Sequence, residues 1–109
     1  MSEESLWLAA KNGDVALLSA IIATKTGVDA QDNEDQTPLH LAAEKGHSDV
    51  VQVLIDAKAS VDAKGKYDRT ALHLAARNGH TDTAKVLIDA KAAVNVRDDV
   101  DSIPLHLAA

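Results

Sequence analysis

The most informative stretch of the chain is the heptapeptide Thr37-Pro38-Leu39-His40-Leu41-Ala42-Ala43, because it recurs at a fixed distance. It returns as Thr70-Ala71-Leu72-His73-Leu74-Ala75-Ala76 and again as Ile103-Pro104-Leu105-His106-Leu107-Ala108-Ala109, with a period of 33 residues. A degraded copy begins at Glu4. Residues 37–69 and 70–102 share 18 identities in 33 positions, which is too many for chance without gaps. The chain is therefore built from an internal repeat.

Each period predicts two short helices. Thr37 offers a capping hydroxyl and Pro38 suits the first helical position, so a helix is expected to begin there. Gly46 tolerates the left-handed conformation that ends many helices. Ser48 is expected to begin a second helix, which is apolar over most of its circumference and has its polar residues on one face: Asp49, Gln52 and Asp56.

Helices of about eight to ten residues are too short to be stable alone in water. Each predicted helix is also apolar over most of its surface, so it needs neighbours to cover it. The economical solution is to stack helix pairs, with the alanine pairs of each copy allowing close approach. The sequence therefore predicts an all-α solenoid of stacked helix-turn-helix units.

The heptapeptide, the following Gly-His, the two apolar helical turns and the Val-Asp-Ala or Val-Asn connection, at a period of 33, resemble the ankyrin repeat. The resemblance implies that the connections project as β-hairpin-like fingers, roughly perpendicular to the helices. It also implies a single domain over 1–109, divided into repeats at about 4–36, 37–69 and 70–102 and a half repeat at 103–109.

The sequence departs from the family pattern at several positions. Lysine replaces the usual glycine after the second helix, at Lys25, Lys58 and Lys91, where a left-handed backbone would cost on the order of 1 kcal/mol or more. Aspartate replaces the glycine of the hairpin, at Asp35, Asp68 and Asp101. Trp7 stands where the motif has histidine.

The five histidines invite a metal or catalytic interpretation, but their spacing does not support it. His47 and His80 follow His40 and His73 by seven residues and across a glycine turn, whereas helical zinc ligands stand at i and i+4. The resemblance implies that each motif histidine is buried and hydrogen-bonds the motif threonine and the backbone. Ile103 replaces that threonine before His106.

Other chemistry also lacks a motif. The acidic runs at 32–35 and 98–101 do not match a helix-loop-helix calcium loop, which needs glycine at position 6 and glutamate at position 12. The five glycines are scattered, so no phosphate-binding loop is expected. No cofactor and no metal are predicted. An enzyme using His47 or His80 is a minor alternative that a pH-dependent activity lost in His47→Ala would support.

The composition narrows the choice of partner. The chain of 109 residues has 11 basic and 17 acidic residues, a net charge of −6, which disfavours nucleic acid and anionic membranes. It has no cysteine, an acidic start and no apolar run long enough to span a bilayer. We therefore expect a soluble monomer inside the cell, in the cytoplasm.

The resemblance places the partner in the concave groove between the fingers and the first helix of each repeat. At the second repeat, with the finger that precedes it, this surface includes Asn33, Glu34, Gln36, Glu44 and Lys45. At the third repeat, with the finger that precedes it, the surface includes Lys64, Lys66, Tyr67, Arg69, Arg77 and Asn78. Tyrosine and arginine are enriched in interface hot spots. We expect the third repeat, centred on Tyr67, Arg69 and Arg77, to contact a protein with acidic or polar groups.

The leading prediction is a non-enzymatic protein–protein interaction module that binds through this groove. The alternative is a fragment of a larger multidomain scaffold, channel or bacterial effector, in which the array orients another domain. Residues beyond Ala109 would discriminate between these two interpretations.

Overall fold

The computed structural model describes residues 3–24, 27–94 and 96–98. Within these ranges it contains six α-helices, one short 3-10 helix and no β-strand. The α-helices are α1 (Glu3–Asn12), α2 (Val15–Ala23), α3 (Pro38–Lys45), α4 (Ser48–Asp56), α5 (Ala71–Arg77) and α6 (Thr81–Asp89), and the 3-10 helix η1 is Lys66–Asp68. The predicted half repeat at 103–109, with Ile103 and His106, and the departures at Lys25 and Asp101 lie outside the described residues.

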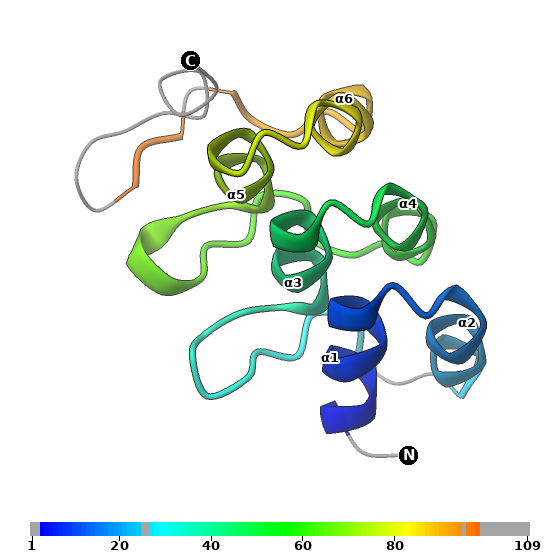
Figure 1. Cartoon of the computed structure of the whole chain (residues 1–109). Coiled ribbons are helices and arrows are strands. Elements are labelled where there is room, and N and C mark those ends of the chain that lie inside the picture. The colour runs from blue at the N-terminus through cyan, green and yellow to red at the C-terminus, as the bar shows by residue number, and fades with distance from the viewer. Residues whose placement is uncertain (1–2, 25–26, 95, 99–109) are drawn as a thin grey trace.

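The helices form two rows (Figure 1). The inner row contains α1, α3 and α5, and the outer row contains α2, α4 and α6; neighbouring helices are in contact along each row. The two helices of each pair also contact one another. Each helix pair therefore lies against the next along the chain. The loops before α3 and α5 extend away from the outer row, on the far side of the inner row.

The helix boundaries confirm the capping prediction. The Thr37 side chain accepts a hydrogen bond from the backbone N–H of His40, and the Thr70 side chain accepts one from His73 in the same way. Gly46 ends α3 in the left-handed conformation, at φ 74°. Local sequence signals therefore set where the inner helices begin and end.

One continuous apolar core runs through the stack. Small residues from the inner row let the helices approach closely, and larger residues from the outer row fill the space behind them. Its fully buried members include Ala9, Ala10, Leu18, Ile21, Ala42, Ala43, Leu54, Ala75 and Leu87. The predicted polar face of α4 is exposed, at Asp49, Gln52 and Asp56. The equivalent face of α6 is exposed too, at Asp82, Lys85 and Asp89.

The positions that lack the family's glycine do have a left-handed backbone. Lys58 has φ 69° and Lys91 has φ 71°, while Asp35 and Asp68 have φ 62° and 56°. Tyr67 shares this conformation, at φ 61°, although no feature of the repeat pattern predicts it there. Because a side chain disfavours positive φ, each of these residues carries backbone strain.

The connections differ from the expected β-hairpins. In the described residues of the first finger (27–36) and in the second finger (58–69), no strand is assigned. An equivalent backbone hydrogen bond closes each tip: the N–H of Asp32 donates to the carbonyl oxygen of Gln36 at 2.9 Å, and the N–H of Gly65 donates to that of Arg69 at 2.9 Å. The hairpin part of the prediction is therefore not confirmed, and the fingers are turns.

Candidate functional site

The tip of the first finger is held by one carboxylate. Oδ1 of Asp32 accepts hydrogen bonds from the N–H of Glu34 at 2.8 Å and of Gln36 at 3.0 Å. This Asx-type arrangement replaces the ladder that a strand pair would provide. As a result, Asp32 has a structural role while the side chains of Asn33 and Glu34 remain exposed.

Polar contacts join the two fingers. The carboxamide oxygen of Gln36 accepts a hydrogen bond from the Lys66 N–H at 3.3 Å, and Nε2 of Gln31 donates to the Lys64 carbonyl oxygen at 3.4 Å. Nζ of Lys66 lies 3.2 Å from a carboxylate oxygen of Glu34. This hydrogen bond raises the pKa of Lys66, with a smaller contribution from the charge of Glu34. The fingers therefore form one connected surface.

The motif histidine His40 holds the second finger to α3, and His73 repeats its local contacts. Nε2 of His40 donates to the carbonyl oxygen of Arg69 at 2.9 Å, so Nδ1 is the acceptor for the Thr37 hydroxyl at 2.8 Å and for the Thr37 N–H at 3.1 Å. His73 makes the same contacts with Thr70. Both histidines are buried, as the resemblance implied. Burial lowers the pKa of His40 below its ordinary value of 6.5.

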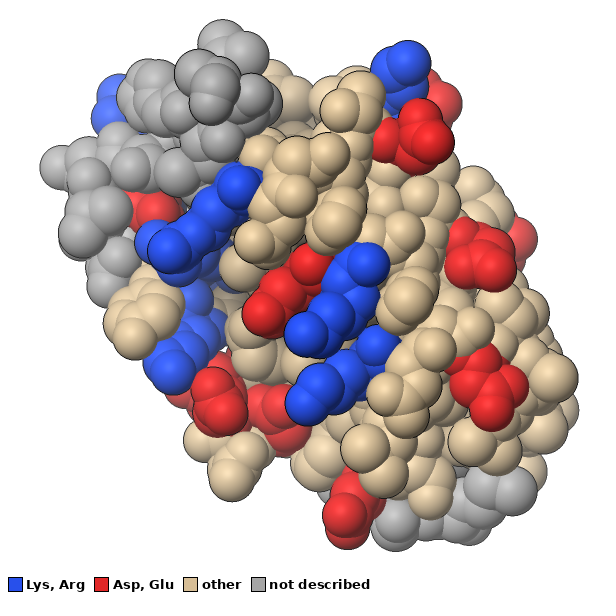
Figure 2. Space-filling view, in the orientation of Figure 1, with Lys and Arg blue, Asp and Glu red and all other residues tan. Residues whose placement is uncertain are grey.

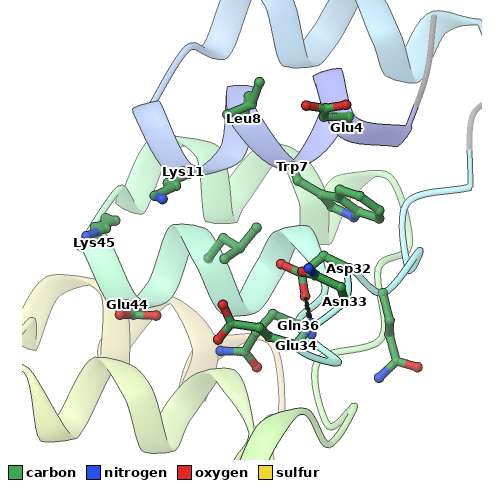
Figure 3. Close-up of a pocket in the computed structure, with 12 residues that line it drawn as sticks. Glu4, Trp7, Leu8, Lys11, Asp32, Asn33, Glu34, Gln36, Glu44 and Lys45 are labelled. Atoms are coloured by element: carbon green, nitrogen blue, oxygen red, sulfur yellow. Dashed lines mark hydrogen bonds between the residues drawn. The ribbon is translucent and has the colours of Figure 1, made fainter.

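Trp7 makes a comparable connection in the first repeat. Its indole N–H donates to the carbonyl oxygen of Ala30 at 2.8 Å, which joins α1 to the first finger. The residue that replaces the motif histidine therefore still ties an inner helix to a finger. In Figure 3 its ring extends from α1 toward Asp32 and Asn33.

The second finger carries a cluster of cations around one aromatic ring. Tyr67 is 52% exposed, and the Lys66 Nζ and the Arg69 Cζ each lie 5.2 Å from its ring centroid. At this distance a cation is attracted by the face of the ring. Nε of Arg69 also lies 3.3 Å from Asp98, whose side chain has no exposed surface. Arg69 therefore has a structural role in addition to its place at the surface.

Two adjoining hollows follow the inner row. The first hollow, of about 820 Å³, lies between α1, α3 and the first finger (Figure 3), and is lined by Glu4, Trp7, Leu8, Lys11, Gln31, Asp32, Asn33, Glu34, Gln36, Leu41, Glu44 and Lys45. The second hollow, of about 310 Å³, is lined by Glu34, Gln36, Glu44, Lys66, Tyr67, Arg69, Leu74, Arg77 and Asn78. Three residues belong to both: Glu34, Gln36 and Glu44.

Most of the site residues predicted from sequence line these hollows. Asn33, Glu34, Gln36, Glu44 and Lys45 line the first, and Lys66, Tyr67, Arg69, Arg77 and Asn78 line the second. Lys64 is exposed but lines neither. Gln36 differs from the rest because it is only 8% exposed and accepts the hydrogen bond from Lys66.

Sequence reasoning missed the apolar part of the site. Trp7, Leu8 and Leu41 line the first hollow, and Leu8 is 49% exposed. The period offered a signal, since Leu8 and Leu41 occupy equivalent positions 33 residues apart. The face of the molecule that bears the hollows interleaves acidic and basic side chains (Figure 2), whereas acidic side chains lie along the edge formed by the outer row.

The described residues also bear on metal binding and on membrane insertion. Over residues 3–24, 27–94 and 96–98, no three His, Cys, Asp or Glu side chains are grouped so that they could hold a metal ion. In the same part of the chain, no helix is both long and apolar enough to cross a membrane.

The comparisons with known proteins agree with the repeat pattern. A family model for ankyrin repeats, in three copies, matches residues 6–98. No curated protein matches the chain closely enough to add to this assignment. Ankyrin repeats are generally protein–protein interaction modules. Since the match covers most of the sequence, the chain belongs to the ankyrin-repeat family.

Proposed function

We propose that the chain is a non-enzymatic module that binds another protein through its concave face. This face is formed by the two fingers and by α1, α3 and α5. The observation that carries the proposal is that one set of residues has a structural role and a different set lines the surface. The motif residues Thr37, His40, Thr70 and His73 are buried, and His40 holds the second finger, whereas side chains outside the motif line two adjoining hollows.

Rigidity supports the same conclusion. The fingers are tied to each other through Gln36 and Lys66, and the second finger is tied to α3 through His40. A surface that is ordered before binding loses little conformational entropy when the partner arrives. The groove is therefore suited to recognition without rearrangement.

We place the centre of the contact at Tyr67, Arg69 and Arg77, facing acidic or polar groups of the partner. Tyr67 and Arg77 are exposed, and both residue types are enriched among residues that dominate binding energy. Arg69 lies 3.3 Å from the buried carboxylate of Asp98, so it positions the finger and adds positive charge to the surface.

The experiment compares capture of proteins from a cell lysate by three forms of the chain. The groove variant is Tyr67→Ala with Arg77→Ala, and the control is Gln52→Ala with Lys85→Ala on the exposed face of the outer helices. Arg69 is left intact because its loss would disturb Asp98. We expect wild type and control to capture the same proteins and the groove variant to lose them.

Capture that is lost only in the control would contradict the proposal. It would favour the second candidate, in which the array orients another domain of a larger scaffold, channel or effector through its outer face. Circular dichroism of each variant checks that folding is unchanged.

A further inference from the structure

Charge and apolar surface are distributed unevenly along the concave face. The first hollow is lined by four carboxylates and two cations: Glu4, Asp32, Glu34, Glu44, Lys11 and Lys45. The second hollow is lined by two carboxylates and three cations: Glu34, Glu44, Lys66, Arg69 and Arg77. Glu34 and Glu44 line both hollows, so two carboxylates lie at their junction. The charge of the lining therefore changes along the groove, from net negative in the first hollow to net positive in the second.

The first hollow also has an apolar part. It is lined by Trp7, Leu8 and Leu41, and Leu8 is one of the few large apolar side chains in the described part of the chain that is about half exposed. The hydrogen bond from the Trp7 indole to Ala30 fixes the ring against the first finger. A preordered apolar surface of this kind favours an apolar anchor from the partner.

We propose that the groove binds an extended segment of a partner protein in one fixed orientation, which is set by opposite charges at the two ends of the segment. The apolar and basic side chains of the segment occupy the first hollow, where a basic group pairs with Glu44. The acidic side chains of the segment occupy the second hollow, where they contact Tyr67 and Arg77. Charge complementarity favours this orientation, because the reverse orientation would place like charges against one another. This inference rests on the proposed function and adds to it the chemistry and orientation of the partner.

The dimensions of the molecule set the length of the segment. The longest extent of the molecule is 37 Å. An extended chain rises about 3.3 Å per residue, so about twelve residues cover this distance. A random library of twelve-residue peptides, displayed on phage and selected against the wild-type chain, is therefore a suitable unbiased probe.

The sequences of the selected peptides and the fluorescence of Trp7 give independent readouts. We expect the peptides to contain an apolar and basic half followed or preceded by an acidic half. Trp7 is the only tryptophan, so its emission reports occupancy of the first hollow directly. Peptides that change this emission but carry no segregated charge would overturn the inference, and so would a failure to select any peptide.

Charge reversal tests the orientation. With a selected peptide, Arg77→Glu should lower affinity about tenfold, and a peptide whose acidic half is changed to lysine should recover it. Glu44→Lys should likewise weaken binding, through the basic half of the peptide. Lys85→Glu, in the outer row, should change the contacts of neither half of the peptide. The orientation would be overturned if Arg77→Glu and Glu44→Lys each weakened the contacts of the acidic half and of the basic half of the peptide equally.

The outcomes separate this inference from the proposed function. If selected peptides bind in the groove without the charge pattern, the inference fails and the function stands. If selected peptides leave Trp7 emission unchanged and respond only to Lys85→Glu, both fail, because binding then occurs on the outer face.

Discussion

Nε2 of His47 lies 3.0 Å from the main-chain carbonyl oxygen of Lys11, thirty-six residues earlier. His80 makes the equivalent contact, at 3.0 Å, with the carbonyl oxygen of Glu44. Both carbonyls belong to the last turn of an inner helix, where the backbone has no partner within the helix. Each histidine precedes an outer helix of the next repeat and donates to this carbonyl, so the pair joins consecutive repeats.

Loss of one such contact should weaken the stack. We expect His80→Ala to lower the free energy of unfolding by about 1–2 kcal/mol, because the carbonyl of Glu44 loses its donor. Urea denaturation measures this change, and Lys85→Ala on the exposed face of α6 serves as the control. Equal midpoints for wild type and His80→Ala would show that the contact does not join the repeats.

Two glycines provide a matched test of how closely the repeats approach. Gly46 and Gly79 both have φ 74°, but a Cβ at Gly46 would lie 2.6 Å from Nδ1 of His80. Apart from the adjoining backbone, no atom of the described residues lies within 4 Å of a Cβ at Gly79. We expect Gly79→Ala to cost about 1 kcal/mol from backbone strain alone and Gly46→Ala to cost at least about 2 kcal/mol. Thermal denaturation gives both values.

The double variant Gly46→Ala with His80→Ala completes this test. Because removal of the ring removes the clash, its loss of stability should be smaller than the sum of the two single losses. Additive losses would mean that the ring of His80 does not pack against the turn at Gly46.

Local sequence features predicted most of the fold. The hydroxyl of Thr37, the ring of Pro38 and the absence of a side chain at Gly46 act within one helical turn, so the sequence predicted the ends of α3. The period of 33 predicted that equivalent residues would share an environment, and His40 and His73 do so.

The parts that sequence missed depend on how repeats meet. The acceptors of His47 and His80 lie thirty-six residues away, and no local pattern identifies them. The burial of Gln36 follows from the approach of the second finger, and the pairing of Arg69 depends on Asp98 in the next repeat. Leu8 is half exposed because of its place at the end of the inner row, which a residue-by-residue reading does not show.

A lysine in a left-handed turn offers a stabilising substitution. Lys58 has φ 69°, so we expect Lys58→Gly to stabilise the chain by up to about 1 kcal/mol, which raises the melting temperature by about 4–8 °C. The neighbouring Ala57 has φ −86°, and Ala57→Gly should lower the melting temperature instead. A lower melting temperature for Lys58→Gly would mean that its side chain stabilises the turn by more than the strain it causes.

The two arginines of the second hollow should differ in their effect on folding. Arg69→Ala removes a partner of the fully buried Asp98 carboxylate and should lower the free energy of unfolding by about 2–3 kcal/mol. Arg77→Ala, at an exposed position, should stay within about 0.5 kcal/mol of wild type. Guanidinium denaturation compares them, and similar losses for both would contradict the structural role of Arg69.

The buried His40 should make stability depend on pH. Burial lowers its pKa in the folded chain below 6.5, and hydrogen bonds to the carbonyls of Arg69 and Ala63 only partly oppose this effect. The unfolded chain therefore takes up a proton at a higher pH than the folded chain does. Its contribution to stability is complete above 6.5 and is lost as the pH falls toward the lowered pKa.

Urea midpoints measured between about pH 7.5 and about pH 5.5 test this dependence. The stability of wild type should fall as the pH is lowered over this range. The stability of His40→Gln should fall less between the same two pH values. The same slope in both proteins would assign the pH dependence to other groups.

Amide hydrogen exchange with and without a bound partner tests the central claim most directly. The tips of the two fingers, residues 31–36 and 64–69, include exposed turns, so a partner that covers them slows amide exchange there locally. We predict slower exchange in both fingers and little change at the exposed faces of α4 and α6. Protection confined to α4 and α6, with the fingers unchanged, would contradict binding through the concave face.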